Sequence, residues 1–258
     1  GREVMRFLPR INEDVNEEWI SDKTRFVWDG LRRQRLDTPY IRKNGKLQPA
    51  TWQEAFAVIA DRVRSAKPDR IAALAGDLVA AEPVKALKDL MLSLGVASLD
   101  CRQDGAKIGH GPREGYLFNT TIAGIESADA LLLVGTNPRW EAPIVNARIR
   151  KSWLRNDLKI MRLGPRVDLT YGVADLDNNP AALLDIAAGK HGAFETLKNA
   201  KHPMLIVGQG ALARPDGAAI LAAAAQIARN TGMIGPAGEG GWNGFNVLHT
   251  AAARVGAL

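Results

Sequence analysis

The feature that most constrains the fold is the apolar run Ala130–Val134, which ends directly in the loop Gly135-Thr136-Asn137-Pro138. Every residue of this run is apolar, so a strand here has both faces buried, as in a parallel sheet covered by helices on both sides. Comparable short runs at Lys159–Leu163 and Met204–Val207 are separated from it by segments with helical spacing of apolar residues. We therefore predict an α/β fold, with a parallel sheet whose strands are joined by right-handed crossovers.

Helix signals support the same alternation. Thr51, with Glu54 three residues on, forms a capping box before an amphipathic helix that runs to about Ser65. Pro83 stands where the first turn of a helix tolerates proline, and Gly95 can close that helix. The remaining predicted elements are a strand at Arg70–Ala75 and helices at Ala142–Leu154, Ala181–Ala188 and Gly217–Arg229.

The first 47 residues lack this regular pattern. We predict a strand at Glu3–Leu8, followed by a long charged and irregular stretch. Between Asp22 and Lys46 the sequence has eight basic and three acidic residues, and such an excess can neutralise the phosphates of nucleic acid. No nucleic-acid-binding motif accompanies this basic stretch, so we expect that it does not bind nucleic acid. We expect instead that it forms a face that docks on an acidic protein surface or a further domain. Interleaved apolar residues have spacings that suggest anchoring in a core: Trp19, Phe26, Trp28, Leu31 and Leu36.

The single cysteine, Cys101, limits the chemistry of the chain. It excludes an internal disulfide framework, and it excludes an iron-sulfur cluster or a cysteine-rich zinc site built from this chain alone. We predict a reduced packing thiol at Cys101 and a loop residue at His110, and we expect neither to be a metal ligand. No run approaches the roughly 18 apolar residues of a membrane-spanning helix, so we expect no direct membrane insertion.

Ligands bind to parallel sheets in the crevice beyond the carboxyl ends of the strands, where loops expose backbone amides. In the first such loop, Gly135 allows a sharp turn and Asn137 can bond the main chain or a ligand. A later loop, Gly208-Gln209-Gly210, begins a dinucleotide-binding pattern but has Ala213 where the next glycine is expected. From the residues alone, structural turns and nucleotide-binding loops both remain open.

These loops together resemble the pterin-dinucleotide scaffold of the molybdopterin oxidoreductases, a Rossmann-like αβα fold. The matching positions are Gly135–Pro138, Pro143, Gly164-Pro165-Arg166, and Thr231-Gly232 with Gly235, Gly238 and Gly240. In catalytic members an aspartate at the place of Gly164 helps to hold the guanine dinucleotide, and glycine cannot make those hydrogen bonds. The resemblance therefore implies vestigial cofactor loops, with no catalytic residue and no metal ligand. Their residues are Gly135, Asn137, Pro138, Gly164, Pro165, Arg166, Gly208 and Gly210.

The start of the chain departs from the same family in a second way. Lys23-Thr24-Arg25-Phe26 resembles the segment that follows the last cysteine of a 4Fe-4S site, but Ser21 occupies the cysteine's place. Without a thiolate no cluster is held there. The resemblance thus divides the chain into residues 1–48, a remnant of a degenerate 4Fe-4S-type segment, and residues 49–258, an α/β molybdopterin oxidoreductase-like domain that can comprise two lobes.

Longer stretches resemble one branch of this family, the large iron-sulfur subunit of NADH:quinone oxidoreductase, respiratory complex I. They are Glu3–Arg10, Asn12–Leu36, Asn119–Glu126, Thr136–Lys151 and Val167–Tyr171. That resemblance implies that this chain is a piece of a longer subunit, truncated at both ends. The whole subunit carries 2Fe-2S and 4Fe-4S clusters outside this piece and relays electrons from NADH towards quinone. We expect this region to be a non-catalytic scaffold without a cofactor; the alternative is a working molybdopterin- or nucleotide-binding oxidoreductase fragment.

The same resemblance implies the partners and the location. The partners are the other peripheral-arm subunits of complex I and the missing N-terminal iron-sulfur region, and the location is the cytoplasmic face of the bacterial inner membrane, or the matrix side in a eukaryote. Two surfaces are candidates for docking. One is Gly1–Leu47, and the other is a helix face with Arg148, Arg150, Lys151 and Arg155, for which simple solvation is the alternative.

Overall fold

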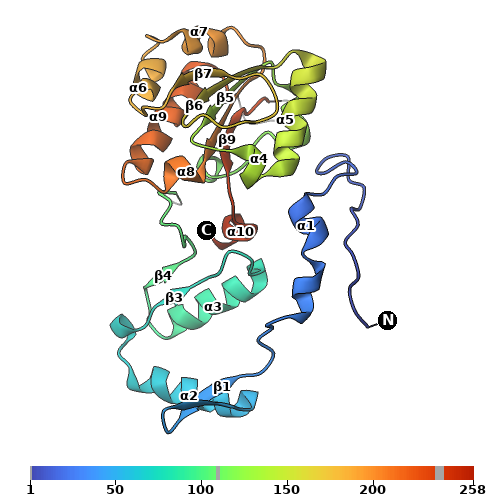
Figure 1. Cartoon of the computed structure of the whole chain (residues 1–258). Helices are drawn as coiled ribbons and strands as arrows, with labels where there is room; N and C mark the ends of the chain where they lie inside the picture. The colour runs from blue at the N-terminus through green and yellow to red at the C-terminus, as the bar shows by residue number, and fades with distance from the viewer. Residues whose placement is uncertain (1, 109–110, 236–240) are drawn as a thin grey trace. The chain divides into compact units, whose positions relative to one another are not determined.

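The computed structural model describes residues 2–108, 111–235 and 241–258. The chain forms two compact units, and Figure 1 shows the elements of each. Unit 1 comprises residues 1–8, 21–101 and 257, and unit 2 comprises residues 9–20, 102–256 and 258.

Unit 2 is built on a five-stranded parallel sheet with the strand order β7-β6-β5-β8-β9 (Figure 1). The central strand pairs with its neighbours in simple register, since Ala130 lies opposite Lys159 on one side and Pro203 on the other. The α/β prediction and three of the predicted strands are confirmed, whereas β7 and β9 were not predicted. The strands are β5 (Ala130–Val134), β6 (Lys159–Leu163), β7 (Ala174–Asp177), β8 (Pro203–Gly208) and β9 (Phe245–Leu248).

Helices cover both faces of this sheet. On one face Ile149 of α5 packs with Leu131 and Leu133, and on the other the alternate residues Leu132 and Val134 belong to a cluster with residues of α6, α7, α8 and α9. Both faces of β5 are therefore buried, which is the arrangement that its apolar sequence predicts. The helices of unit 2 are α4 (Pro138–Glu141), α5 (Pro143–Asn156), α6 (Ala182–Ala187), α7 (Gly192–Lys198), α8 (Gln209–Leu212), α9 (Gly217–Asn230) and α10 (Arg254–Ala257), with 3₁₀ helices η3 (Arg113–Gly115) and η4 (Ala123–Ser127).

An ion-pair network fixes the segment 9–20 on helix α5. Arg148 donates to the Glu13 carbonyl at 2.7 Å and pairs with Glu126, and Lys151 pairs with both Glu17 and Glu126. The Arg148 side chain is only 5% exposed. Arg148 is therefore buried within its own chain, and its predicted docking role and simple solvation are both wrong. Lys151 is partly exposed and Arg150 and Arg155 are exposed, so a docking role for these three stays a prediction.

Unit 1 contains two helices of 14 and 13 residues, short strands, and few buried residues. Thr51 accepts a hydrogen bond from the Glu54 amide at 3.2 Å, and the Glu54 carboxylate accepts one from the Thr51 amide at 2.8 Å, which confirms the capping box. A two-stranded parallel pair, β3 and β4, flanks one helix. The elements are α1 (Asp22–Phe26), η1 (Trp28–Arg32), β1 (Tyr40–Lys43), β2 (Lys46–Pro49), α2 (Trp52–Ser65), η2 (Pro68–Arg70), β3 (Ala73–Leu74), α3 (Ala81–Ser93) and β4 (Leu99–Asp100).

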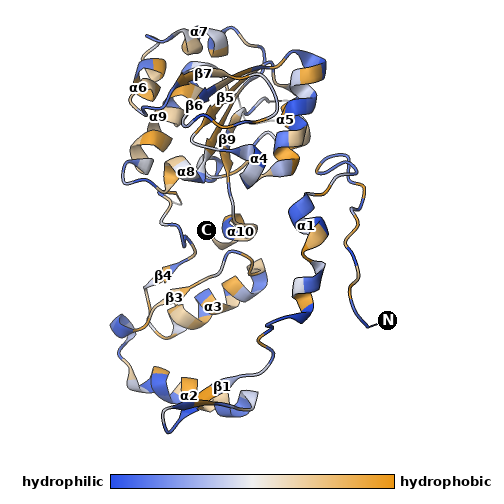
Figure 2. Cartoon of the chain, in the orientation of Figure 1, coloured by the Kyte–Doolittle hydropathy of each residue, from blue (hydrophilic) through white to orange (hydrophobic). Residues whose placement is uncertain are grey.

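Three predictions for unit 1 and for the segment 9–20 are wrong. Residues Glu3–Leu8 form no strand, and the strand predicted at Arg70–Ala75 is reduced to β3, because Arg70 ends a 3₁₀ turn. Among the described residues of unit 1, only Ala75, Met91 and Val96 are buried. The apolar residues predicted to anchor in a core lie instead at the surface or only partly buried: Trp19, Phe26, Trp28, Leu31 and Leu36. Figure 2 shows hydrophobic residues along both α2 and α3.

Candidate functional site at the carboxyl edge of the sheet

The strand order places a switch point between β5 and β8. The chain runs from β5 outward through β6 to β7, then crosses to β8 and runs outward to β9 on the other side. In sheets of this kind, ligands bind where the connections diverge, beyond the carboxyl ends of the two central strands. The loop that begins at Gly135 and the loop that begins at Gly208 therefore flank the expected binding crevice.

These two loops pack directly on each other. Gly135 has a φ of +55°, and a Cβ added there would lie 2.6 Å from the Cβ of Ala211. A Cβ at Gly210 would lie 2.9 Å from the Gly135 carbonyl oxygen, and one at Gly208 would collide with Thr136. These distances are shorter than any van der Waals contact, so the glycines are required by contact between the loops. The two loops therefore hold each other in place at the switch point.

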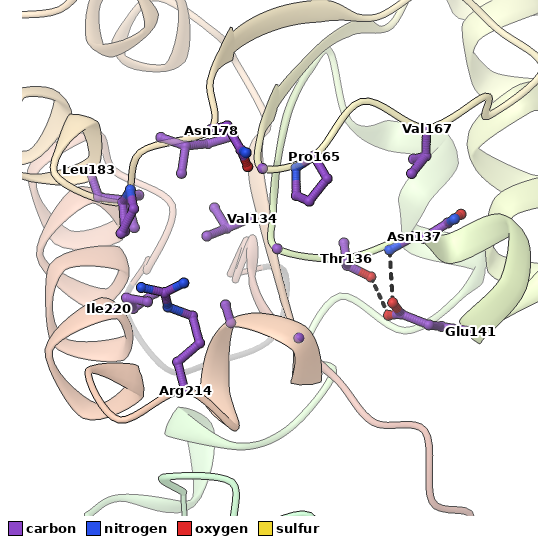
Figure 3. A pocket seen from close by; sticks show the side chains of 16 residues that line it. Val134, Thr136, Asn137, Glu141, Pro165, Val167, Asn178, Leu183, Arg214 and Ile220 are labelled. Carbon is purple, nitrogen blue, oxygen red and sulfur yellow. Dashed lines mark hydrogen bonds between the residues drawn. The ribbon is translucent and has the colours of Figure 1, made fainter.

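An open cavity of about 440 Å³ lies beyond the carboxyl ends of β5, β6 and β8, and Gly135, Gly164 and Gly210 are among the residues that line it (Figure 3). Its volume is within the ordinary range for small-molecule pockets, roughly 300–1,000 Å³. The walls are mostly apolar, with a few polar groups from separate loops. The lining includes Val134, Thr136, Asn137, Glu141, Val167 and Arg214.

The Glu141 carboxylate binds the loop that follows β5. One oxygen accepts a hydrogen bond from the Thr136 hydroxyl at 2.6 Å, and the other accepts one from the Asn137 amide at 2.9 Å (Figure 3). The Oδ1 atom of Asn137 is buried without a hydrogen-bond partner within the described part of the chain. Glu141 was not among the predicted site residues. It approaches Asn137 only because the short helix α4 forms, and no sequence pattern predicts that helix.

The turn after β6 has a backbone that suits glycine. Gly164 has a φ of +142°, a conformation that residues with side chains rarely adopt, and its amide donates to the Asp177 carbonyl at 2.8 Å. An aspartate here would have to strain or rebuild the turn. Pro165 lines the cavity, whereas Arg166 lies outside it in a neighbouring hollow and pairs with Asp175 at 3.0 Å.

The cation nearest the cavity is already paired. Arg214 follows α8, lines the cavity, and contacts both carboxylate oxygens of Asp216, with Nε 2.7 Å from Oδ1 and Nη2 2.9 Å from Oδ2. Hydrogen bonding to this carboxylate raises the pKa of Arg214, and the same contact lowers the pKa of Asp216. No sequence pattern connects Arg214 with the Gly135 loop, so its place in the lining could only come from the structure.

The sequence matches the family described as "Molybdopterin oxidoreductase" over residues 35–258. The chain belongs to the molybdopterin oxidoreductase family. Residues 1–29 also match the family described as "NADH-ubiquinone oxidoreductase NDSU1/NuoG-like, 4Fe-4S domain".

Curated relatives match the whole chain. It is 47% identical to the mitochondrial NADH dehydrogenase [ubiquinone] iron-sulfur protein 1 of Solanum tuberosum, covering 100% of this chain and 35% of the relative. It is 46% identical to an NADH-quinone oxidoreductase subunit of Rickettsia conorii and 47% identical to the same subunit of Rickettsia felis, covering 100% of this chain and 38% of each. The resemblance to the large iron-sulfur subunit of this oxidoreductase is confirmed, and the chain spans little more than a third of the length of these relatives.

The described residues do not fit the pterin dinucleotide that the family implies. Gly164 replaces an aspartate in a backbone conformation that disfavours one. A ligand oxygen would also have to displace the Glu141 carboxylate from the Thr136 and Asn137 donors.

A 4Fe-4S cluster does not fit either. Ser21 caps helix α1 by accepting a hydrogen bond from the Thr24 amide at 3.2 Å, so the cysteine's place has a structural role. The whole sequence contains one cysteine, and a cluster of this type needs four thiolates. Within residues 2–108, 111–235 and 241–258, no group of three or more His, Cys, Asp or Glu residues could hold a metal ion.

Cys101 and Gly232 do not line the cavity. Cys101 follows β4 in unit 1 and is partly buried. Gly232 has a φ of +74° just after α9, whereas His110, Gly238 and Gly240 lie outside the described residues. None of the described helices has the length and apolar character needed to cross a membrane.

Proposed function

We propose that this chain is a cofactor-free supporting region of the iron-sulfur subunit of NADH-quinone oxidoreductase, the complex that passes electrons from NADH to quinone. The observation that carries the proposal is the turn after β6, where Gly164, at a φ of +142°, stands in place of the aspartate that helps to hold the guanine dinucleotide in catalytic members. The names of the relatives support the assignment to this oxidoreductase, of which they are subunits. The region keeps the fold of a cofactor-binding family and uses its ligand loops for packing.

In this proposal the electrons travel through clusters bound elsewhere in the subunit. A 2Fe-2S and several 4Fe-4S centres need many thiolates, and this chain supplies a single cysteine. Its contribution is mechanical: unit 2 has a large core that holds a rigid surface in place. The loops with Gly135, Asn137, Pro138, Gly164, Pro165, Arg166, Gly208 and Gly210 are accordingly remnants of a dinucleotide site, with no catalytic role.

Unit 1 supplies the docking surface. It exposes large apolar side chains on α2 and α3 and carries the basic stretch between Asp22 and Lys46. Such a surface suits apolar, acid-rimmed faces of the peripheral-arm subunits and of the cluster-bearing region. We place the assembly at the cytoplasmic face of a bacterial inner membrane, or at the matrix side in a mitochondrion, with residues 1–48 and 49–258 as the family's two segments.

A second candidate is a module that binds a nucleotide or pterin cofactor. The cavity of about 440 Å³ beside Gly164 favours it, since the volume is sufficient for part of a nucleotide. Against it stand the paired Arg214 and the Glu141 carboxylate, which leave no free cation for a phosphate among the described lining residues.

The deciding experiment measures molybdenum, iron and oxidised pterin in the purified chain, produced in a host that makes the cofactor. The proposal expects all three at background level. Pterin with near-stoichiometric metal would overturn it and would make the Gly135 and Gly164 loops part of a working site. A cofactor-containing molybdopterin oxidoreductase, produced and purified in parallel, serves as the positive control.

A further inference from the structure

We propose that Glu141 is the residue that excludes phosphate-bearing ligands from the cavity beside β5. The inference rests on the proposed function in one respect, because it identifies the group that keeps the cavity free of a dinucleotide. It goes further by assigning this selectivity to one side chain, separately from the absence of the aspartate at Gly164. The cavity therefore discriminates by charge as well as by shape.

The contacts of Glu141 are those that a phosphate would need. Its two oxygens accept from the Thr136 hydroxyl and from the Asn137 amide, at the carboxyl end of the central strand. Phosphate oxygens in dinucleotide sites accept from donors in loops at this position. The carboxylate satisfies both donors and brings a negative charge, so an incoming anion finds no free donor there and meets repulsion.

No cation in the described lining offsets this charge. Arg214 is the only positively charged residue among the described lining residues, and its guanidinium is bound to Asp216. Figure 3 shows Arg214 and Glu141 on opposite sides of the cavity, which leaves the Glu141 carboxylate without a cationic partner across it. Charge repulsion in a partly enclosed space is stronger than at an open surface, because water screens it less.

The remaining walls would accept a ligand. Val134, Val167 and the other apolar side chains give the cavity an ordinary hydrophobic lining, and its volume suffices for a nucleoside. An uncharged ligand of similar size is therefore not excluded by the same feature. Comparison of a charged with an uncharged form of one ligand isolates the effect of Glu141.

The test compares GDP with guanosine on the 258-residue chain and its Glu141→Gln variant, by titration calorimetry. Glutamine keeps the size of the side chain and removes its charge. We expect the variant to bind GDP at least about tenfold more tightly than the unchanged chain, with guanosine affinity altered less than about twofold. Glu195→Gln on α7, outside the cavity lining, is the matched control and should change neither affinity.

Each other outcome overturns the inference. Equal gains for GDP and guanosine would mean that the substitution enlarges the cavity, and no gain in a folded variant would mean that Glu141 does not exclude phosphate. Should Glu141→Gln fail to fold, Glu141→Ala removes the same charge, and it must raise GDP affinity over guanosine affinity by a similar factor. Pterin bound to the unchanged chain would overturn the proposed function. A chain without pterin, whose Glu141→Gln variant binds GDP no more tightly, would overturn only this inference.

Discussion

Units 1 and 2 contain helices with equally clear sequence signals, yet they differ in what those helices bury. In unit 2, α5 and α9 pack their apolar faces on a shared sheet, and its strands β5 and β8 are almost inaccessible to water. In unit 1, Trp52 and Phe56 of α2 form a ring pair with centroids 5.6 Å apart, and each remains 59% exposed. Periodicity therefore predicts that an amphipathic helix forms, and the surrounding chain decides whether its apolar face is covered.

The two units therefore differ in the origin of their stability. Unit 2 can be stabilised by its own core, whereas unit 1 buries three apolar residues among those described and leaves its other large apolar side chains at least partly exposed. Substitutions in the two units test this contrast, and their expected effects on stability range from several kcal/mol to almost none.

The largest effect should come from the sheet of unit 2. Leu205 on β8 is fully buried, so Leu205→Ala leaves a cavity and should lower the free energy of unfolding by about 2–5 kcal/mol. Leu92→Ala on α3 removes the same atoms from an exposed position and should cost less than about 1 kcal/mol. Urea unfolding followed by circular dichroism gives both values, and equal losses would show that unit 1 has a core of its own.

The ion-pair network should come next. Arg148→Ala leaves the Glu17 and Glu126 carboxylates without their buried partner and should cost roughly 2–4 kcal/mol. It should also make the segment 9–20 susceptible to limited proteolysis, because its carbonyl contacts with Arg148 are lost. Arg155→Ala, an exposed position on the same helix, is the control, and comparable damage there would contradict the network's role.

The turn at Gly164 should show a smaller, backbone effect. Gly164→Asp places a side chain at a φ of +142° and should cost about 1–3 kcal/mol. Gly192→Ala at the start of α7 meets no atom within 4 Å and should change stability by less than about 1 kcal/mol. Thermal unfolding distinguishes the two, and a neutral Gly164→Asp would show that this turn can accept the carboxylate of the catalytic relatives.

The pH dependence should be weaker still. Burial of Glu126 would raise the pKa of its carboxyl, but hydrogen bonds from Arg148 and Lys151 outweigh burial and hold the pKa below its ordinary 4.5. A lowered folded-state pKa stabilises the fold above pH 4.5, and this stabilisation disappears as the pH falls through the folded value. Glu126→Gln should therefore cost more at pH 6 than at pH 3, by less than about 1 kcal/mol because the carboxylate is partly exposed. Urea unfolding of both proteins at the two pH values measures the difference, and an equal cost at both would contradict it.

The smallest effect on stability should belong to the exposed face of α2. Trp52→Ser with Phe56→Ser should change the free energy of unfolding by less than about 1 kcal/mol, because neither side chain is buried. The same pair should sharply reduce co-purification of the chain with subunits of NADH-quinone oxidoreductase. Gln53→Ser on the same helix is the control, and unchanged assembly by the double variant would count against a docking role for this face.

The sequence predicted β5, β6 and β8 because their side chains are apolar on both faces. It missed β7, whose Ala-Asp-Leu-Asp sequence is polar because it lies at the edge of the sheet. It also missed β9, where the fully buried Asn246 interrupts the apolar pattern and accepts hydrogen bonds from the Thr120 amide and hydroxyl. Edge strands are stabilised by distant partners, so local pattern alone does not reveal them.

In the candidate site, too, the sequence predicted some residues and missed others. Gly135, Gly208 and Gly210 stand out in the sequence, but their use for contact between loops depends on the strand order. Glu141 and Arg214 enter the site through α4 and α8, which have only four residues each and no periodicity to predict. The expected anchors Phe26 and Leu36 have the spacing of core residues, and nothing in that spacing shows which surface would cover them.

The backbone at Gly164 makes the absence of the aspartate hard to reverse by mutation. A single codon change could restore the carboxylate, yet the new side chain would begin from a left-handed turn, face loops that already touch, and share the cavity with Glu141. Each of these obstacles would have to be removed by a further substitution that brings no benefit alone. Several coordinated substitutions would therefore have to precede a working aspartate at this position.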